Sequence, residues 1–230
     1  MLNELYTAQG QNFDEKAWDI YPRPQMRRDS YVNLNGLWDF AVSKEGVLPK
    51  TYDKQIRVPF CPESALSGLK MEVEPGSYLF YRRKLELPEG WKNGKVLLHV
   101  GAADQIAKIY VNRIPMQEHE GGYNAFTVDI TAQLKEENEL VIRVYDDLKD
   151  QSFPYGKQSL NRGGMWYTPV SGIWQSVWLE CVPHNYIGAL QIEAMDNYGV
   201  QIRIQPAEDA VVIVEGLGEF PMKKNYLLLV

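Results

Sequence analysis

A long polar stretch that ends in aromatic residues is the part of this sequence best equipped for chemistry. It runs from Asp146 to Gly164 (DDLKDQSFPYGKQSLNRGG), and Trp166 and Tyr167 follow at once. The flat apolar faces and polar edges of Trp and Tyr suit stacking on a sugar ring, and the polar groups beside them can hydrogen-bond sugar hydroxyls. The candidate substrate-binding residues are Asp146, Asp147, Lys157, Gln158, Arg162, Trp166 and Tyr167.

The same aromatic residues have a second interpretation as packing residues. Trp166, Tyr167 and Trp174 lie in the segment MWYTPVSGIWQSVW, which holds three of the six tryptophans. A large core needs aromatic side chains, and a long loop can equally serve to dock a neighbouring domain. Both roles stay open, and packing in a core or between domains is the favoured one.

No catalytic residue is assigned from the acidic side chains. Carboxylates near predicted loops usually cap turns or face water, and we expect this of each of them. The acids in question are Glu63, Asp104, Glu118, Glu120, Asp146 and Asp147.

Histidine and cysteine do not show the spacing of a metal site or a nucleophile. The histidines are His99, His119 and His184, and no pair of them has a ligand spacing. Cys61 and Cys181 stand outside any Cys-x-x-Cys motif, so free thiols are expected. The sequence also lacks a glycine-rich phosphate loop and a Gly-x-Ser-x-Gly motif. We therefore expect no metal and no cofactor.

Strands with period-two alternation are the elements that must position the loop. Val96, Leu98 and Val100 alternate with Leu97 and His99, and the run 140–145 repeats the pattern. Only residues 130–135 offer a helical turn, so the fold class is all-β, with two sheets packed as a sandwich. The predicted core comprises Trp38, Phe40, Leu98, Ile109, Val111, Phe126, Ile142, Val144 and Trp178.

A change in composition near Pro183 predicts a domain boundary, with one domain over residues 1–183 and a second over 184–230. Three strands are predicted beyond it, at Tyr186–Met195, Val200–Gln205 and Ala210–Glu215, joined by turns at 196–199 and 206–209. The segment Tyr226–Val230 reads as an apolar strand whose partners are expected outside this sequence. Another chain, a non-native pairing or the first domain is expected to cover it.

Charge and hydropathy exclude two classes of partner. The 230 residues carry a formal net charge of -6 and a pI near 5.2, which argues against nucleic acid. No apolar run approaches the ~18 residues that cross a bilayer, and no secretion signal is visible. We expect a bacterial protein of the cytoplasm, with the periplasm as the alternative, and no membrane partner.

Several separated motifs resemble glycoside hydrolase family 2, which includes the β-galactosidases and β-glucuronidases. The motifs are YPRPQMRRDSYVNLNGLWDF (21–40), RVPFCPES (57–64), HEGGYNAFTVDIT (119–131) and GKQSLNRGGMWYTPVSGIWQSVWLE (156–180). The resemblance implies a jelly-roll β-sandwich that binds sugar, followed by the truncated start of an immunoglobulin-like β-sandwich. It also implies that the catalytic carboxylates lie on a later (β/α) barrel. The family's galactosidases have an aspartate just before the Met-Trp pair, where this sequence has Gly164.

Three functional hypotheses follow. The first is the noncatalytic amino-terminal part of a family 2 glycosidase, whose loop 146–167 forms the rim of an active site built by the barrel. The second is a freestanding carbohydrate-binding module, and the third is a structural domain that docks the barrel or neighbouring subunits. The expected partners are the remaining domains of the parent glycosidase, carbohydrate and, as an open possibility, a second copy of the chain. The sequence alone does not identify the glycoside that the parent cleaves.

Overall fold

The computed structural model describes residues 6–14, 20–148, 150, 152–196, 198–205, 210–222 and 226–229. The turn expected at 206–209 and the end of the expected tail strand, Val230, lie outside the described residues. The chain divides into two compact units, of which the first is Met1–Pro22 with Ser30–Cys181 and the second is Arg23–Asp29 with Val182–Val230. Within the described ranges, no helix has the length and apolar character needed to span a bilayer.

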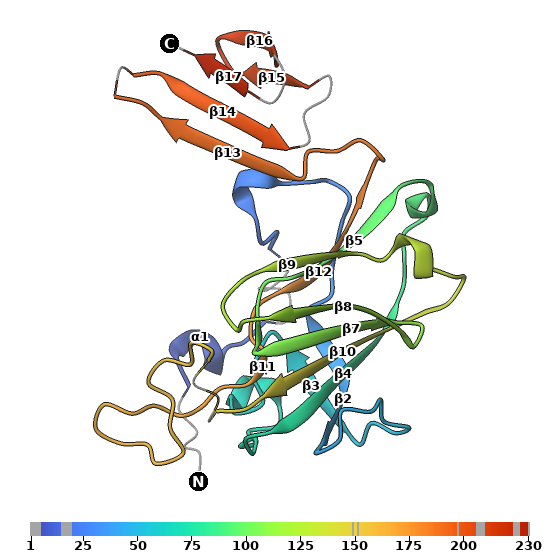
Figure 1. Cartoon of the computed structure of the whole chain (residues 1–230), viewed down its shortest axis with the longest axis vertical. Coiled ribbons are helices and arrows are strands. Elements are labelled where there is room, and N and C mark those ends of the chain that lie inside the picture. The colour runs from blue at the N-terminus through green and yellow to red at the C-terminus, as the bar shows by residue number, and fades with distance from the viewer. Residues whose placement is uncertain are drawn as a thin grey trace. The chain divides into compact units, whose positions relative to one another are not determined.

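The first unit is built around a six-stranded sheet. Its pairings β3-β2-β4-β10-β7-β8 are all antiparallel (Figure 1). The central strand β10 pairs along its whole length with β4 and brings Asp146 opposite Ser77. The strands are β2 (Gly36–Ser43), β3 (Lys54–Val58), β4 (Ser77–Leu85), β7 (Ile106–Val111), β8 (Ile114–Glu120) and β10 (Asn138–Asp146).

A four-stranded sheet of order β1-β12-β5-β9 forms the other layer of this unit. Its strands are β1 (Tyr31–Asn33), β5 (Lys95–Val100), β9 (Phe126–Asp129) and β12 (Val177–Val182). A further small sheet pairs β6 (Ala103–Asp104) with β11 (Gly172–Ile173). The helical elements are α1 (Ala8–Gln11) and the single 3-10 turns Ala65–Ser67, Trp91–Asn93 and Thr131–Gln133. The helical turn expected within residues 130–135 is thus confirmed. The other helical elements are each about one turn long, so the sequence shows no helical periodicity for them.

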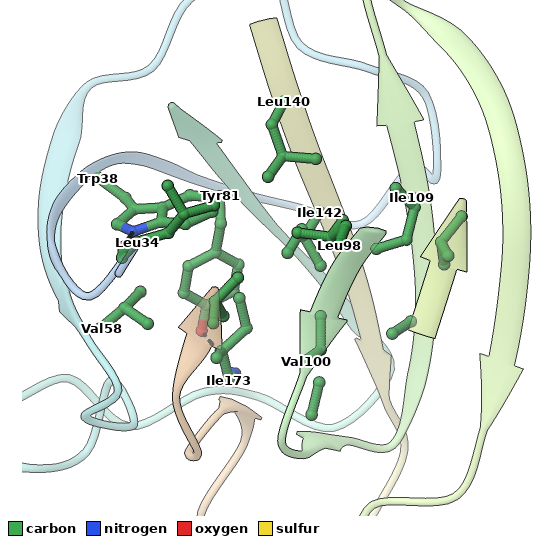
Figure 2. Packing of buried hydrophobic residues seen from close by; sticks show 14 of the residues in the cluster. Leu34, Trp38, Val58, Tyr81, Leu98, Val100, Ile109, Leu140, Ile142 and Ile173 are labelled. Atoms are coloured by element: carbon green, nitrogen blue, oxygen red, sulfur yellow. Dashed lines mark hydrogen bonds between the residues drawn. The ribbon is translucent and has the colours of Figure 1, made fainter. Parts of the chain in front are cut away.

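The core lies between the two sheets, as the alternation predicts. Leu98 and Val100 of β5 face Ile142 of β10 and Ile109 of β7 (Figure 2). Trp38 is 1% exposed, and its indole Nε1 donates to the Leu34 carbonyl at 2.7 Å, which satisfies its polar edge inside the core. Every residue of the predicted core is buried, and the all-β jelly-roll prediction is confirmed.

Trp178 is buried on the opposite side of its strand from the main core. Val177 and Leu179 belong to the core between the sheets, so the alternation of β12 directs Trp178 to the outer face. There its ring stacks on His99 at a centroid distance of 4.9 Å, and its Nε1 donates to Glu180 at 3.1 Å. The sequence identified the burial of Trp178 but not this polar setting.

The second unit consists of small antiparallel sheets. Ile202 and Ile204 of its central strand are buried and Arg203 is exposed, so the predicted alternation of this strand is confirmed. The tail strand pairs with this same strand, with Leu227 opposite Ile202, which corrects the expectation that its partners lie outside the sequence. Residues 23–29 also belong to this unit, where Arg28 donates to the Ile187 carbonyl. The elements are the 3-10 turn Pro24–Met26, β13 (Ala189–Ala194), β14 (Val200–Gln205), β17 (Tyr226–Leu229), and the hairpin of β15 (Val211–Val214) with β16 (Gly218–Pro221).

Candidate sugar-binding loop

The segment between β10 and β11, here named the 147–171 loop, is described at residues 147–148, 150 and 152–171, and these residues extend beyond the strand ends as the yellow to orange segment of Figure 1. The loop folds on itself through a tight turn, in which Gly163 and Trp166 exchange backbone hydrogen bonds of 3.1 Å each. Gly164 lies in this turn with a φ of +59°, a conformation that residues with a side chain rarely adopt. The glycine at this position therefore has a backbone role, and it supplies no carboxylate to a ligand.

Two further backbone bonds hold the arms of the loop together. The Tyr167 amide donates to the Lys157 carbonyl at 2.8 Å, and the Ser159 amide donates to the Tyr167 carbonyl at 3.0 Å. These bonds place Trp166 and Tyr167 on the surface, where they are 45% and 65% exposed. An aromatic pair this exposed contributes little to a core, so the packing interpretation does not hold inside this unit.

Trp166 also lines an open hollow of about 310 Å³ on the loop. Backbone and amide groups beside an indole face are the combination that binds saccharides, because the ring packs on C–H groups and the amides bond to hydroxyls. The lining residues are Pro75, Leu148, Tyr155, Gln158, Ser159, Leu160, Asn161 and Trp166. Of the predicted site residues, only Trp166 and Gln158 meet in this hollow.

Gln158 is already engaged by the loop itself. Its Nε2 donates to the Tyr155 carbonyl at 2.8 Å, and its Oε1 accepts from the Val170 amide at 2.6 Å. The same amide group interacts with the carboxyl of Asp104 and the hydroxyl of Tyr123 beneath the loop. Gln158 therefore holds the shape of the loop as well as lining the hollow.

The remaining predicted residues lie apart from the hollow. Arg162 forms an ion pair with Glu72 and donates to Thr168 Oγ1 at 3.3 Å, so its guanidinium fastens the loop to the segment before β4. Lys157 is exposed and contributes its carbonyl to the loop backbone, and Asp147 is half-buried. Asp146 is buried at the end of β10.

Glu63, Asp104 and Asp146, here named the acid cluster, are buried beneath the loop, which corrects the expectation that these acids face water. They are 7%, 4% and 8% exposed. They come from three separate segments that the β6–β11 pairing brings together, since Asp104 lies opposite Gly172. Gly122 also approaches Asp104 so closely that a side chain there would collide with the carboxyl. Sequence reasoning missed this meeting because it depends on pairing between residues far apart in the chain.

Burial changes the acid–base chemistry of the cluster. Loss of solvation, assisted by the neighbouring carboxyl of Asp104, raises the pKa of Asp146 to about 7. Burial likewise raises the pKa of Asp104 to about 6 and raises the pKa of Glu63. Ser171 bonds to Glu63 twice, with its hydroxyl donating to Oε1 at 2.7 Å and its amide to Oε2 at 3.2 Å.

The other candidates have structural partners. Trp174 donates from Nε1 to the Gly122 carbonyl at 2.8 Å and meets the Tyr123 ring edge-on, which is packing at the base of the loop. Burial raises the pKa of the Cys61 thiol to about 12, so this thiol is unreactive. Throughout the ranges that the structure describes, no group of three His, Cys, Asp or Glu residues has a metal-binding arrangement.

Comparison with known proteins gives the loop a family context. The model of glycosyl hydrolases family 2, sugar binding domain, matches residues 51–183. The chain is 31% identical to a β-galactosidase of Thermoanaerobacter pseudethanolicus over 111 residues, covering 47% of this chain and 14% of that enzyme. It is 22% identical to a β-glucuronidase of Rattus norvegicus over 249 residues, covering 86% of this chain and 38% of that enzyme.

Solved structures share the fold. A β-glucuronidase from Ruminococcus gnavus, in complex with C6-substituted uronic isofagomine, superposes with a TM-score of 0.66 at 20% identity. The superposition covers 92% of this chain and 40% of that chain. The chain thus spans well under half the length of the relatives that it matches.

Proposed function

Because this chain belongs to glycosyl hydrolase family 2, we propose that it is the noncatalytic amino-terminal part of a glycosidase of the β-glucuronidase and β-galactosidase type. In this proposal the 147–171 loop forms the rim of an active site whose catalytic carboxylates lie on a barrel elsewhere in the parent enzyme. The observation that carries it is the exposed Trp166 beside the hollow of about 310 Å³.

The acid cluster does not supply catalysis in this proposal. A retaining glycosidase needs one protonated acid and one ionised nucleophile, with their pKa values driven apart by their surroundings. In the cluster the pKa values of all three acids are raised together by burial and are not driven apart. Each acid is also less than a tenth exposed, which keeps a glycosidic bond out of reach.

Sugar titration tests the rim proposal against the alternative of a freestanding binding module. A rim supplies only part of a sugar site, so this chain alone is expected to show no saturable binding of methyl β-glucuronide or methyl β-galactoside at millimolar concentration. Saturable binding by calorimetry that disappears in Trp166→Ala would instead support the freestanding module. A calcium titration belongs to the same experiment, since some modules use a calcium-supported loop.

In the parent enzyme the rim proposal predicts an effect of the same substitution on catalysis. Trp166→Ala is expected to raise KM for an aryl glycoside more than it lowers kcat, because a rim residue binds ground state and transition state alike. Arg203→Ala, an exposed change in the second unit, is the control. Unchanged kinetics in Trp166→Ala would contradict the rim proposal.

A docking role for the loop is the second candidate, and exposed apolar residues favour it. Leu160, Met165 and Val170 are 51%, 57% and 37% exposed around the aromatic pair. A patch of this kind suits contact with another domain or a second copy of the chain. Replacing Met165 with Ser is then expected to weaken domain association in the parent enzyme, or self-association measured by light scattering, without changing sugar affinity.

A further inference from the structure

The acid cluster lies where it can control the 147–171 loop. Asp146 is the last residue of β10, from which the loop departs, and Ser171 is the residue at which the loop returns. Ser171 bonds to Glu63 through both its amide and its hydroxyl, and its hydroxyl also interacts with Asp146. Both ends of the loop therefore meet the cluster.

Asp104 connects the cluster to the middle of the loop. Its carboxyl interacts with Gln158, whose own amide bonds to Tyr155 and Val170 fix the arms of the hollow. Asp104 Oδ1 is buried and has no hydrogen-bond partner. A buried, unpartnered carboxylate oxygen is costly when charged, and much less so when the carboxyl carries a proton.

No cation compensates the cluster among the interactions that the described residues show. The titratable groups that interact with the three acids are Cys61, Tyr81, Tyr123 and Asp147, besides the acids themselves, and none of these groups is a cation. Arg162 lines the same narrow hollow as Glu63, but its guanidinium is paired with Glu72.

We propose that the acid cluster is a proton-dependent latch: it holds the 147–171 loop closed while Asp104 and Asp146 are protonated, and it releases the loop when they ionise. Ionisation places like charges together in a buried site, and opening of the loop restores their contact with water. The proposal concerns the mobility of the loop, and its test does not depend on whether the chain binds sugar.

The direction of the pH effect follows from the raised pKa values. The closed loop binds protons more tightly than an open loop in which the acids have ordinary pKa values near 4. The latch is therefore at full strength below about pH 4 and weakens as the pH rises through about 6 and 7. Each unit of pKa difference between the closed and open forms changes the opening equilibrium about tenfold.

Hydrogen exchange of the full chain between pH 5 and pH 8.5 tests the latch. After correction for intrinsic exchange chemistry, the opening population of the loop amides is expected to rise at least about tenfold over this range. Amides of β10, such as that of Ile142, serve as the internal reference and are expected to keep their protection. A loop whose opening does not change with pH would overturn the proposal.

Matched variants distinguish a proton-dependent latch from a general increase in the mobility of the loop. Asp146→Asn and Asp104→Asn replace an acid by a neutral amide of the same shape, and each is expected to reduce the pH dependence of loop opening. Asp150→Asn is the control, because Asp150 is a partly exposed acid of the same loop and accepts hydrogen bonds from the amide and hydroxyl of Ser152. Full pH dependence in both cluster variants, or its loss in the control, would contradict the latch.

If either cluster variant fails to fold, carboxyl titration of the unmodified chain by NMR decides, and pKa values near 4 for both acids would refute the proposal.

Discussion

Gly172 and Gly164 both have positive φ angles, yet their surroundings differ. A Cβ at Gly172 would collide with the Tyr81 hydroxyl, whereas a Cβ at Gly164 would meet nothing within 4 Å. Gly172→Ala is expected to lower the free energy of unfolding by on the order of 3 kcal/mol, from backbone strain and overpacking together. Gly164→Ala introduces backbone strain without a steric collision, and its free energy of unfolding is expected to fall by about 1–2 kcal/mol. Urea unfolding of both variants makes the comparison, and equal losses would show that the close approach at Gly172 has no energetic weight.

Glu180 is fully buried on the outer face of the four-stranded sheet and receives several donors. Tyr21 and Trp178 donate to Oε1, and His99 Nε2 lies 3.2 Å from Oε2. Glu180→Ala leaves the Trp178 indole and the Tyr21 hydroxyl without their acceptor and removes the carboxylate beside His99, so a loss of about 3–5 kcal/mol is expected in chemical denaturation. Asp53→Ala breaks an exposed pair with Lys54 and is expected to leave the midpoint unchanged. A small loss of stability in Glu180→Ala would show that other groups accept the hydrogen bonds of these donors.

Residue types predicted burial better than they predicted charge environments. The apolar core lies where alternation places it, because one face of a strand must be buried. His99 lies on the opposite face of β5, where it is buried against Trp178. Asp104 and Asp146 do not face water as expected, since the sequence shows only that they lie near predicted loops. Their burial depends on which distant segments close the end of the sandwich, and no local pattern encodes that.

The strand β10 is the element on which the first unit depends most, because it pairs with both β4 and β7. Val144 lies in its core-facing register and is fully buried. Val144→Ala removes two methyl groups and leaves a cavity, and a loss of about 1–3 kcal/mol is expected in thermal unfolding of the first unit. Amide exchange of Ile202 and Ile204 in the second unit is expected to stay the same. A neutral effect on the first unit would contradict the central place of this strand.

Elements with several alternating residues were predictable, and two-residue elements were not. The strands β5, β10 and β14 contain enough alternation to identify them from sequence. The strands β6 and β11 hold two residues each, and they exist only because they pair with one another. The candidate site was found through the length of its loop and its aromatic residues, whereas the hollow required the folded backbone of the loop.

At the scale of the whole molecule, we propose that the catalytic carboxylates lie on a barrel elsewhere in the parent enzyme. This predicts that the present chain alone hydrolyses no aryl glycoside. The three members of the acid cluster lie beneath a loop, and the pKa values of all three are raised. Incubation with nitrophenyl β-glucuronide, β-galactoside, β-mannoside and β-glucoside is expected to give rates equal to buffer. Turnover that vanishes in Asp146→Asn or Glu63→Gln would place a catalytic centre in this chain and contradict the proposal.

Residues 23–29 belong to the second unit although they precede every strand of the first. During synthesis this segment leaves the ribosome some 150 residues ahead of its partner strands, which begin after Val182. At 5–20 residues per second the delay is roughly 8–30 s, during which the strands of the sandwich are made one after another up to β12. The order of translation thus keeps this early segment without its partner strands until the last strand of the first unit has been synthesised.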